Sequence, residues 1–309
     1  MRNGVFYMKA IVGPFIFELK RRRLKKDLLS KMTAGSGYLF SEKDVELYVA
    51  ERFAKLPIAS VDGTDDPALL KVTLGGKQVF WPSSLSPDDL PWLYHEIFDP
   101  FIGKPSSYDH PGIGYMNREW VIDAGAAEGY FSVFALENSC GKVLCIEPLS
   151  IMKPALERTL ASYSGMERST VITAALGERP GFSEIQIDSR HICDSRILLD
   201  TSPIERSENA PKTEKVSIVT IDQLVDQYSL GKGGVIKMDI EGFEMAALMG
   251  ATETMKRYKP ALAIAVYHDL DNAKKCAEII ITANPEYKIE FRGYYGYFDP
   301  PRPYLVFAF

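Results

Sequence analysis

Two apolar runs in the sequence end in residues that could bind a small polar ligand. The first leads into the segment 123–129, where Gly125 permits a tight turn against a ligand and Gly129 lets a helix start close to the strand. The second run ends at Glu147, 22 residues after Gly125. A carboxylate at this point of a dinucleotide-binding fold accepts the ribose hydroxyls of a nucleoside. The two patterns together predict a site for a nucleoside-containing ligand.

The residues around the glycine turn indicate which kind of nucleoside compound fits. The dinucleotide fingerprint requires a glycine where Ala127 stands, which disfavours a nicotinamide dinucleotide and leaves no seat for a pyrophosphate. Asp123, two residues before the first glycine, instead suits the ammonium group of a zwitterionic ligand. The residues that border the two motifs are also expected to contact the ligand: Ala126, Tyr130, Phe131 and Pro148.

A third strand end carries two carboxylates, Asp239 and Glu241. If the pleat of the strand persists, both side chains face the open C-terminal edge of the sheet, where they could orient cofactor or substrate. The alternative is that Glu241 and Glu244 only complement the positive end of the following helix, and this interpretation is favoured for Glu244. Two acids without a third ligand do not make a metal site, so the sequence predicts none and leaves the need for a divalent metal open.

His268 follows the apolar run 261–267 at the same edge of the sheet. A histidine there could accept a proton from a substrate hydroxyl, and together with Asp239 it is the candidate catalytic group. The alternative, left open, is a histidine that hydrogen-bonds the next loop. His191 and Arg196 lie in the polar stretch 188–214, which is too long for a simple connection and is either a functional flap or a mobile excursion. Both residues, like Glu241, are candidates for acceptor contacts.

Alternating strands and helices must position these residues. From residue 119 the pattern predicts βαβ units and a mainly parallel sheet. Thr220 and Gln223 match a capping box. The predicted strands are 120–123, 142–146, 170–174, 235–238, 261–266, 287–291 and 304–309, with two further β-like pieces at 182–187 and 215–219.

The N-terminal third has a different organisation. Apolar alternation on both sides of Gly75 and Gly76 predicts a hairpin over 71–81, and Ser86 followed by a proline predicts a helix that runs to about residue 98. Turn formers at 60–67 suggest a boundary. The sequence is therefore divided into a basic arm and helical extension (1–65), a hairpin and helix lead-in (66–118) and a ligand-binding domain (119–309).

Composition narrows the functional classes. Residues 1–32 carry nine basic and two acidic side chains, and the whole chain carries a net charge of −5, so the body is acidic and nucleic-acid binding is not expected. The basic arm could touch anionic lipid headgroups, or it is simply a solvated helix face. The four cysteines form no CxxC pair, and no apolar run suits a membrane span or a secretory signal, which predicts reduced thiols and a cytoplasmic location. The oligomeric state stays open.

Five segments resemble the FkbM methyltransferase family and occur in its order: 121–132, 146–148, 174–177, 219–224 and 236–244. The resemblance covers roughly residues 119–268, and Lys237 to Glu244 is its most specific part. It implies an α/β class I methyltransferase fold, Rossmann-like, with a seven-stranded mainly parallel sheet and an antiparallel last strand, here joined to an N-terminal helical and hairpin extension. It also implies O-methylation of a hydroxyl on a sugar or secondary metabolite.

The resemblance assigns roles by position. S-adenosylmethionine is the implied cofactor: Asp123, Gly125 and Gly129 would hold its methionine portion, Glu147 its ribose, and Ala174 and Ala175 would lie near its adenine. Asp239 would sit by the reacting methyl, with His268 or Asp239 drawing the proton from a hydroxyl of a small-molecule or glycan acceptor. Many family members have asparagine where this chain has Ala127. The alternatives are a non-catalytic cofactor-binding regulator and, less favoured, an NAD(P)-dependent oxidoreductase.

Overall fold

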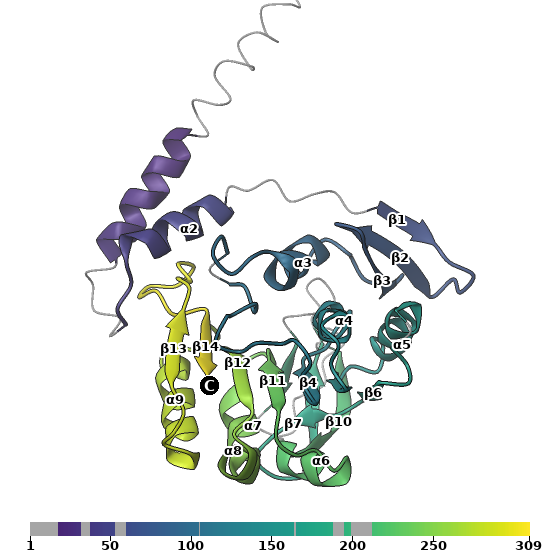
Figure 1. Cartoon of the computed structure of the whole chain (residues 1–309). Coiled ribbons are helices and arrows are strands. Elements are labelled where there is room, and N and C mark those ends of the chain that lie inside the picture. The colour runs from purple at the N-terminus through teal and green to yellow at the C-terminus, as the bar shows by residue number, and fades with distance from the viewer. Residues whose placement is uncertain are drawn as a thin grey trace, which may run out of the picture.

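A seven-stranded sheet forms the centre of the chain in the computed structural model, which describes residues 18–31, 38–52, 60–104, 106–163, 165–187, 195–198 and 212–309 (Figure 1). The strand order is β13-β14-β12-β11-β4-β5-β6. The last strand, β14, is antiparallel to both of its neighbours, whereas β6, β5, β4, β11 and β12 run parallel. The strands are β4 (Trp120–Ala124), β5 (Lys142–Ile146), β6 (Ser169–Ile172), β11 (Gly234–Met238), β12 (Ala261–Ala265), β13 (Ile289–Arg292) and β14 (Leu305–Ala308).

This order and the antiparallel last strand confirm the predicted fold class, and all seven predicted strands are present. The predicted end of one strand was wrong, because the strand predicted over 170–174 ends at Ile172. The chain then turns away, and Ala175–Leu176 form β7, which pairs in parallel with β10 in a separate sheet. The predicted adenine contacts therefore lie where the chain leaves the central sheet.

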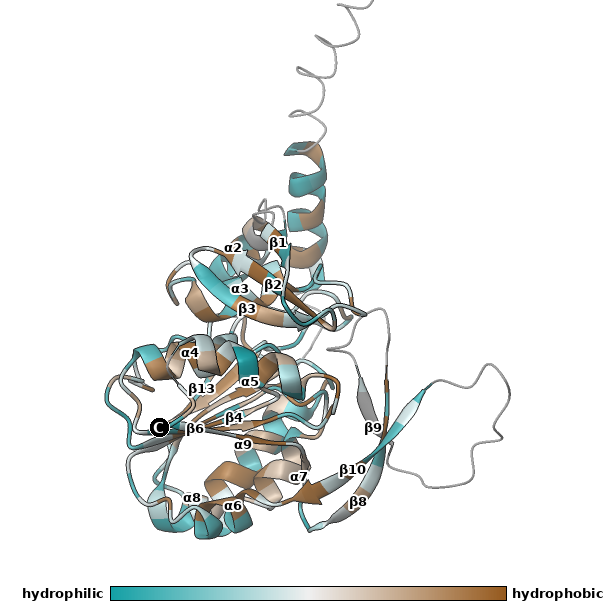
Figure 2. Cartoon of the chain, turned by 90° about the vertical axis from the view of Figure 1, so that its right-hand side faces the viewer, coloured by the Kyte–Doolittle hydropathy of each residue, from teal (hydrophilic) through white to brown (hydrophobic). Residues whose placement is uncertain are grey.

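Helices cover both faces of the central sheet (Figure 2). Strand side chains alternate between the faces, and both sets are buried because both faces are covered. Val121, for example, belongs to the apolar core beneath α4 (Tyr130–Glu137) and α5 (Lys153–Ser162). Ile122 belongs to the opposite core, which packs against α6 (Ile221–Gln227), α7 (Glu244–Met249), α8 (Thr252–Tyr258) and α9 (Asn272–Ala283).

A second sheet, in the order β7-β10-β8-β9, leaves the body as an arm (Figure 2). Its longer strands are β8 (Gly181–Gln186) and β10 (Thr213–Val219), as predicted, and β9 (Arg196–Leu198) pairs with β8. The arm returns to the body at Thr220, whose hydroxyl accepts the backbone N–H of Gln223 while the Gln223 side chain accepts the N–H of Thr220. This confirms the predicted capping box.

Three antiparallel strands form the sheet before the central domain: β1 (Ser60–Gly63), β2 (Leu69–Leu74) and β3 (Lys77–Pro82). The predicted hairpin is confirmed, and its turn residues Gly75 and Gly76 both have positive φ. The segment 60–63, part of the predicted turn-rich boundary at 60–67, pairs with β2, so the sheet begins before the predicted boundary at residue 66. The division into domains stays a prediction.

The helix that follows the hairpin, α3 (Leu90–Phe98), starts later than predicted. The hydroxyl of Ser86 bonds to Asp88 within a turn instead of capping the helix, and Pro91 occupies the start. The helix α3 packs beside α4, and β3 packs beside α5, so the N-terminal part covers one face of the central domain (Figure 1).

Helices also precede the hairpin sheet. Residues 18–31 form one helix, and Lys25 within it is paired with Glu46 of α2 (Glu42–Arg52) at 2.8 Å. Leu28 and Tyr48 pack on Tyr294 of the C-terminal part. Residues 1–17 lie outside the described residues, and the lipid contact of the basic arm stays a prediction.

Two sequence expectations bear on location. Within the described ranges, none of the helices has the length and apolar character needed to cross a bilayer. Three of the four cysteines are buried free thiols, Cys140, Cys145 and Cys276, while Cys193 lies outside the described residues.

Candidate functional site

The glycine turn lies against the end of the neighbouring strand β11. Gly125 has a φ of +75°, and a Cβ atom at this position would overlap the carbonyl oxygen of Asp239. Gly129 caps α4 with a φ of +93°, and a Cβ atom there would lie 2.8 Å from Leu156. Both positions therefore require glycine, as the sequence predicted for a turn with close backbone approach.

Glu147 lies beside this turn, as predicted. Its Oε2 accepts the backbone N–H of Ala127 at 3.1 Å, and its Oε1 accepts the N–H of Leu149 at 2.9 Å. The N–H of Ala127 is presented by a backbone with a φ of +41°, a conformation that asparagine adopts more readily than alanine. Burial raises the pKa of Glu147 to about 7.

A cavity of about 430 Å³ opens between the turn and the end of β11. Most of the predicted site residues lie on its wall: Gly125, Ala126, Phe131, Glu147, Pro148, Ala174, Ala175, Asp239 and Glu241. Asp123, Gly129, Tyr130 and His268 are not on this wall. His191 lies outside the described residues, and Arg196 belongs to β9 with no description of its side chain. Its neighbour Ser195 lines the cavity, so the arm contributes to the wall.

Asp123 has a different environment from the one predicted. It is fully buried, its Oδ1 lies 3.2 Å from Nζ of Lys237, and its Oδ2 accepts a hydrogen bond from Ser132. Nζ of Lys237 also donates to the carbonyl oxygen of Gly125 at 2.9 Å. Although burial opposes the charged form, the carboxylates of Asp123 and Asp239 raise the pKa of Lys237. Asp123 thus anchors the lysine that holds the glycine turn, and its contact with an ammonium group stays a prediction.

A second carboxylate of the turn, Glu128, lies on the cavity wall and was not predicted as a site residue. Its Oε1 accepts the N–H of Tyr130, and its buried Oε2 makes no hydrogen bond to any described residue. Burial raises the pKa of Glu128 to about 7. A buried carboxylate oxygen without a partner favours a cationic ligand group beside it.

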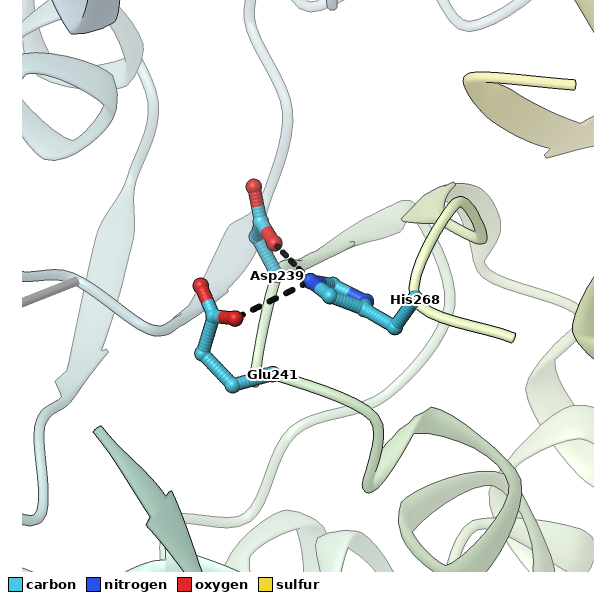
Figure 3. A group of neighbouring side chains, drawn as sticks. All are labelled: Asp239, Glu241 and His268. Carbon is cyan, nitrogen blue, oxygen red and sulfur yellow. Dashed lines mark ion pairs between the residues drawn. The ribbon is translucent and has the colours of Figure 1, made fainter. Parts of the chain in front are cut away.

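Three carboxylates surround His268, and Figure 3 shows two of them, Asp239 and Glu241. Its Nε2 lies 3.2 Å from Oε2 of Glu241 and 3.7 Å from Oδ1 of Asp239, and its Nδ1 lies 3.2 Å from Oε1 of Glu244. The strand β11 ends at Met238 and Glu241 has a φ of +57°, so a backbone bend, and not a continued pleat, brings Asp239 and Glu241 together. Glu244 also accepts the N–H groups of Ile240 and Gly242, the helix-start role expected for it.

The carboxylates around His268 affect its pKa. Burial opposes its charged form, but Glu244 and Glu241 prevail and raise its pKa well above 6.5. Both ring nitrogens thus lie beside carboxylates, and His268 is not on the cavity wall, so its role as the general base stays a prediction. Burial also raises the pKa of Asp239, whose Oδ2 accepts a hydrogen bond from Tyr108 at 3.0 Å. Of the two predicted bases, Asp239 is the one that lines the cavity.

The sequence predicted that the hairpin region before Trp120 helps to shape the acceptor pocket, but it did not indicate which residues of the N-terminal part do so. Trp92 and Glu96 of α3 line the cavity, and so does Tyr108. Glu96 is buried and accepts a hydrogen bond from Tyr304 at 3.1 Å. Two charged residues in mainly apolar surroundings could have indicated a functional site. They are Glu96 in the mainly apolar helix α3 and Lys237 in the fully buried strand β11.

Residues 123–291 match the family model described as the methyltransferase FkbM domain. A solved methyltransferase FkbM from Methylobacillus flagellatus is 26% identical, with a TM-score of 0.48 over 71% of this chain and 50% of that one. A precorrin-6y C5,15-methyltransferase from Geobacter metallireducens is 12% identical, with a TM-score of 0.35 over 63% of this chain and 81% of that one. The AMB antimetabolite synthetase AmbE of Pseudomonas aeruginosa is 22% identical over 287 residues, which are 83% of this chain but 13% of that synthetase.

Proposed function

The chain belongs to the FkbM family of methyltransferases, and from this premise we propose that it methylates a hydroxyl group on a sugar or secondary metabolite, with S-adenosylmethionine as the donor. The observation that carries the proposal is a single cavity lined by Gly125, Glu147 and Asp239. Such a cavity can hold a nucleoside and an acceptor next to each other.

The wall around the glycine turn fits the cofactor. Glu147 would accept the ribose hydroxyls, Ala174 and Ala175 would lie against the adenine, and the exposed backbone at Gly125 would lie along the methionine portion. The partnerless Oε2 of Glu128 suits the ammonium group that was first assigned to Asp123. When bound, the cofactor supplies a methyl group activated on a sulfonium.

The residues of the acceptor side position a hydroxyl and remove its proton. Asp239 lies on the wall at the end of β11, and the hydrogen bond from Tyr108 orients its carboxylate. Tyr267, Tyr295 and Tyr304 also line the cavity. Their rings offer apolar faces with polar edges, which suits a sugar ring or an oxygenated metabolite. The name of the Pseudomonas synthetase points to secondary metabolism and agrees with this acceptor class.

Turnover with a panel of acceptors tests this function. The chain would be incubated with S-adenosylmethionine and matched hydroxyl and amine compounds, including glycosides and hydroxylated amino acids, and S-adenosylhomocysteine would be measured by mass spectrometry. We expect S-adenosylhomocysteine to form when a hydroxyl compound is present, together with the O-methyl ether of that compound. Transfer to amines alone would contradict O-methylation, and no transfer to any acceptor despite cofactor binding would favour the regulatory alternative.

Cofactor binding is expected to depend on pH through Glu147. Because burial raises the pKa of Glu147 to about 7, this carboxyl group is mostly ionised at pH 8 and mostly protonated at pH 6. The ionised form accepts hydroxyl groups better, so the Kd for S-adenosylhomocysteine should rise by up to about tenfold from pH 8 to pH 6, the change in the ionised fraction of this one group. Calorimetric titrations at several pH values measure this change. Glu147→Gln should bind more weakly and show a shallower pH dependence, and an unchanged slope would contradict the assignment.

A further inference from the structure

Asp239, Glu241 and His268 together have the composition of a metal site. Each offers one ligand atom, and the three atoms lie within 4.8 Å of one another. Figure 3 shows the two carboxylates and the ring directed toward one point. Sequence reasoning counted two acids without a third ligand; the structure supplies the third ligand from the end of β12. We propose that these three side chains bind one divalent cation, for which Mn²⁺ is the representative ion.

The distances suit one ion. Ligand atoms bonded at about 2.0–2.2 Å to the same ion lie about 2.8–3.1 Å apart in an octahedral arrangement and about 3.3–3.6 Å apart in a tetrahedral one. Nε2 of His268 lies 3.2 Å from Glu241 and 3.7 Å from Asp239, close to these ranges. Side-chain movements of a few tenths of an ångström would complete the geometry.

Unsatisfied atoms point to a missing partner. The His268 side chain is 9% exposed, and its Nε2 makes no hydrogen bond of acceptable geometry to any described residue. Oδ1 of Asp239 is also buried without a hydrogen bond among the described residues. Buried polar atoms of this kind are costly unless they are paired or coordinate a metal. Three carboxylates converge on one ring, so even a protonated ring leaves negative charge that a cation would neutralise.

A second layer of contacts orients the ring as metal sites require. A ligating histidine usually donates its other N–H to a carboxylate, which fixes the ring orientation. Here Nδ1 of His268 lies 3.2 Å from Oε1 of Glu244, a fully buried carboxylate that also accepts a hydrogen bond from Asn272. Nε2 is thereby left to face Asp239 and Glu241. One nitrogen and two carboxylate oxygens suit Mn²⁺ or Fe²⁺ better than Ca²⁺.

The position of the site suggests its use, and this step rests on the proposed function. Asp239 and Glu241 lie on the cavity wall at the acceptor side, whereas the cofactor residues lie around Gly125. A cation held there could bind the acceptor's hydroxyl oxygen and lower its pKa, which eases proton removal. The acceptor class would then be an alcohol with a second oxygen near the hydroxyl, able to chelate the ion.

Binding of Mn²⁺ to the metal-stripped chain tests the site without an acceptor. Electron paramagnetic resonance of free Mn²⁺ should show one saturable ion per chain. Glu241→Gln and His268→Ala should each weaken binding at least tenfold, because each removes one ligand. Asp269→Asn removes a neighbouring exposed carboxylate outside the cluster and should leave the affinity within twofold.

Calorimetry with S-adenosylhomocysteine on the same samples separates the possible failures. Wild type that binds the nucleoside but no stoichiometric Mn²⁺ would overturn the metal site and leave the methyltransferase proposal intact. Mn²⁺ binding that Glu241→Gln and His268→Ala leave unchanged would also overturn it. Mn²⁺ binding without nucleoside binding would support the metal site and count against the proposed cofactor site.

Discussion

Turnover of Asp239→Asn is expected to fall about 10²–10⁴-fold, the usual contribution of a general base. The substitution keeps the size of the side chain and an oxygen for the hydrogen bond from Tyr108, but an amide cannot take up a proton and binds a cation more weakly than the carboxylate of the proposed metal site. S-adenosylhomocysteine formation with the acceptor found in the panel measures kcat. Because the acceptor hydroxyl is the group affected, the loss should appear mainly in kcat.

Two comparisons isolate this effect. Calorimetry should show that Asp239→Asn still binds S-adenosylhomocysteine within a few-fold of wild type, since Glu147 and the glycine turn are unchanged. Asp226→Asn, on the outer part of α6, serves as a matched control and should retain normal turnover. A kcat for Asp239→Asn within threefold of wild type would remove this residue from proton transfer.

Asp123→Asn is expected to lower the free energy of unfolding by about 3–5 kcal/mol, because it leaves a buried charge without its partner. Only 7% of the Lys237 side chain is exposed in the wild type, so its charge would stay buried in the variant. The side chain of Asp123, its partner, is fully buried. Urea unfolding at neutral pH measures the change. The cause is the loss of a structural ion pair, in contrast to the ligand-binding role that the sequence suggested.

The double variant Asp123→Asn/Lys237→Met distinguishes the ion pair from a general packing defect. Removing the lysine as well should recover a large part of the lost stability, because no unpaired charge is then buried. Cofactor binding of the double variant should be weaker than that of the wild type, since the methionine cannot donate to the carbonyl oxygen of Gly125. A loss below about 1 kcal/mol in the single variant would contradict the predicted cost of a broken buried pair.

The central sheet, and the part of the site at Gly125 and Glu147, could be predicted because patterns of neighbouring residues determine them. Gly125 and Glu147 each follow an apolar strand, and parallel strands bring their C-terminal ends to one edge. The capping box at Thr220 and the turn at Gly75 are also set by neighbouring residues. Their positions could therefore be inferred from spacing alone.

Features that depend on distant contacts could not be inferred in this way. The partner of Asp123 is Lys237, 114 positions later in the chain, and nothing in the local pattern distinguishes a paired carboxylate from a ligand-binding one. The pKa of His268 depends on Glu244, which the sequence showed only as a helix-start residue. Trp92 and Tyr108 precede the segment 123–291 that matches the family model, so no motif indicated their place on the wall.

The contact between Gly125 and the end of β11 has a consequence for how the two ligands communicate. The backbone of the turn rests on the carbonyl group of Asp239, and Lys237 of the same strand donates to the turn. The turn at Gly125 and the bend after β11 are therefore expected to move together. A nucleoside that stiffens the glycine loop would at the same time set the position of the acid that meets the alcohol, so we expect the two compounds to bind with positive cooperativity.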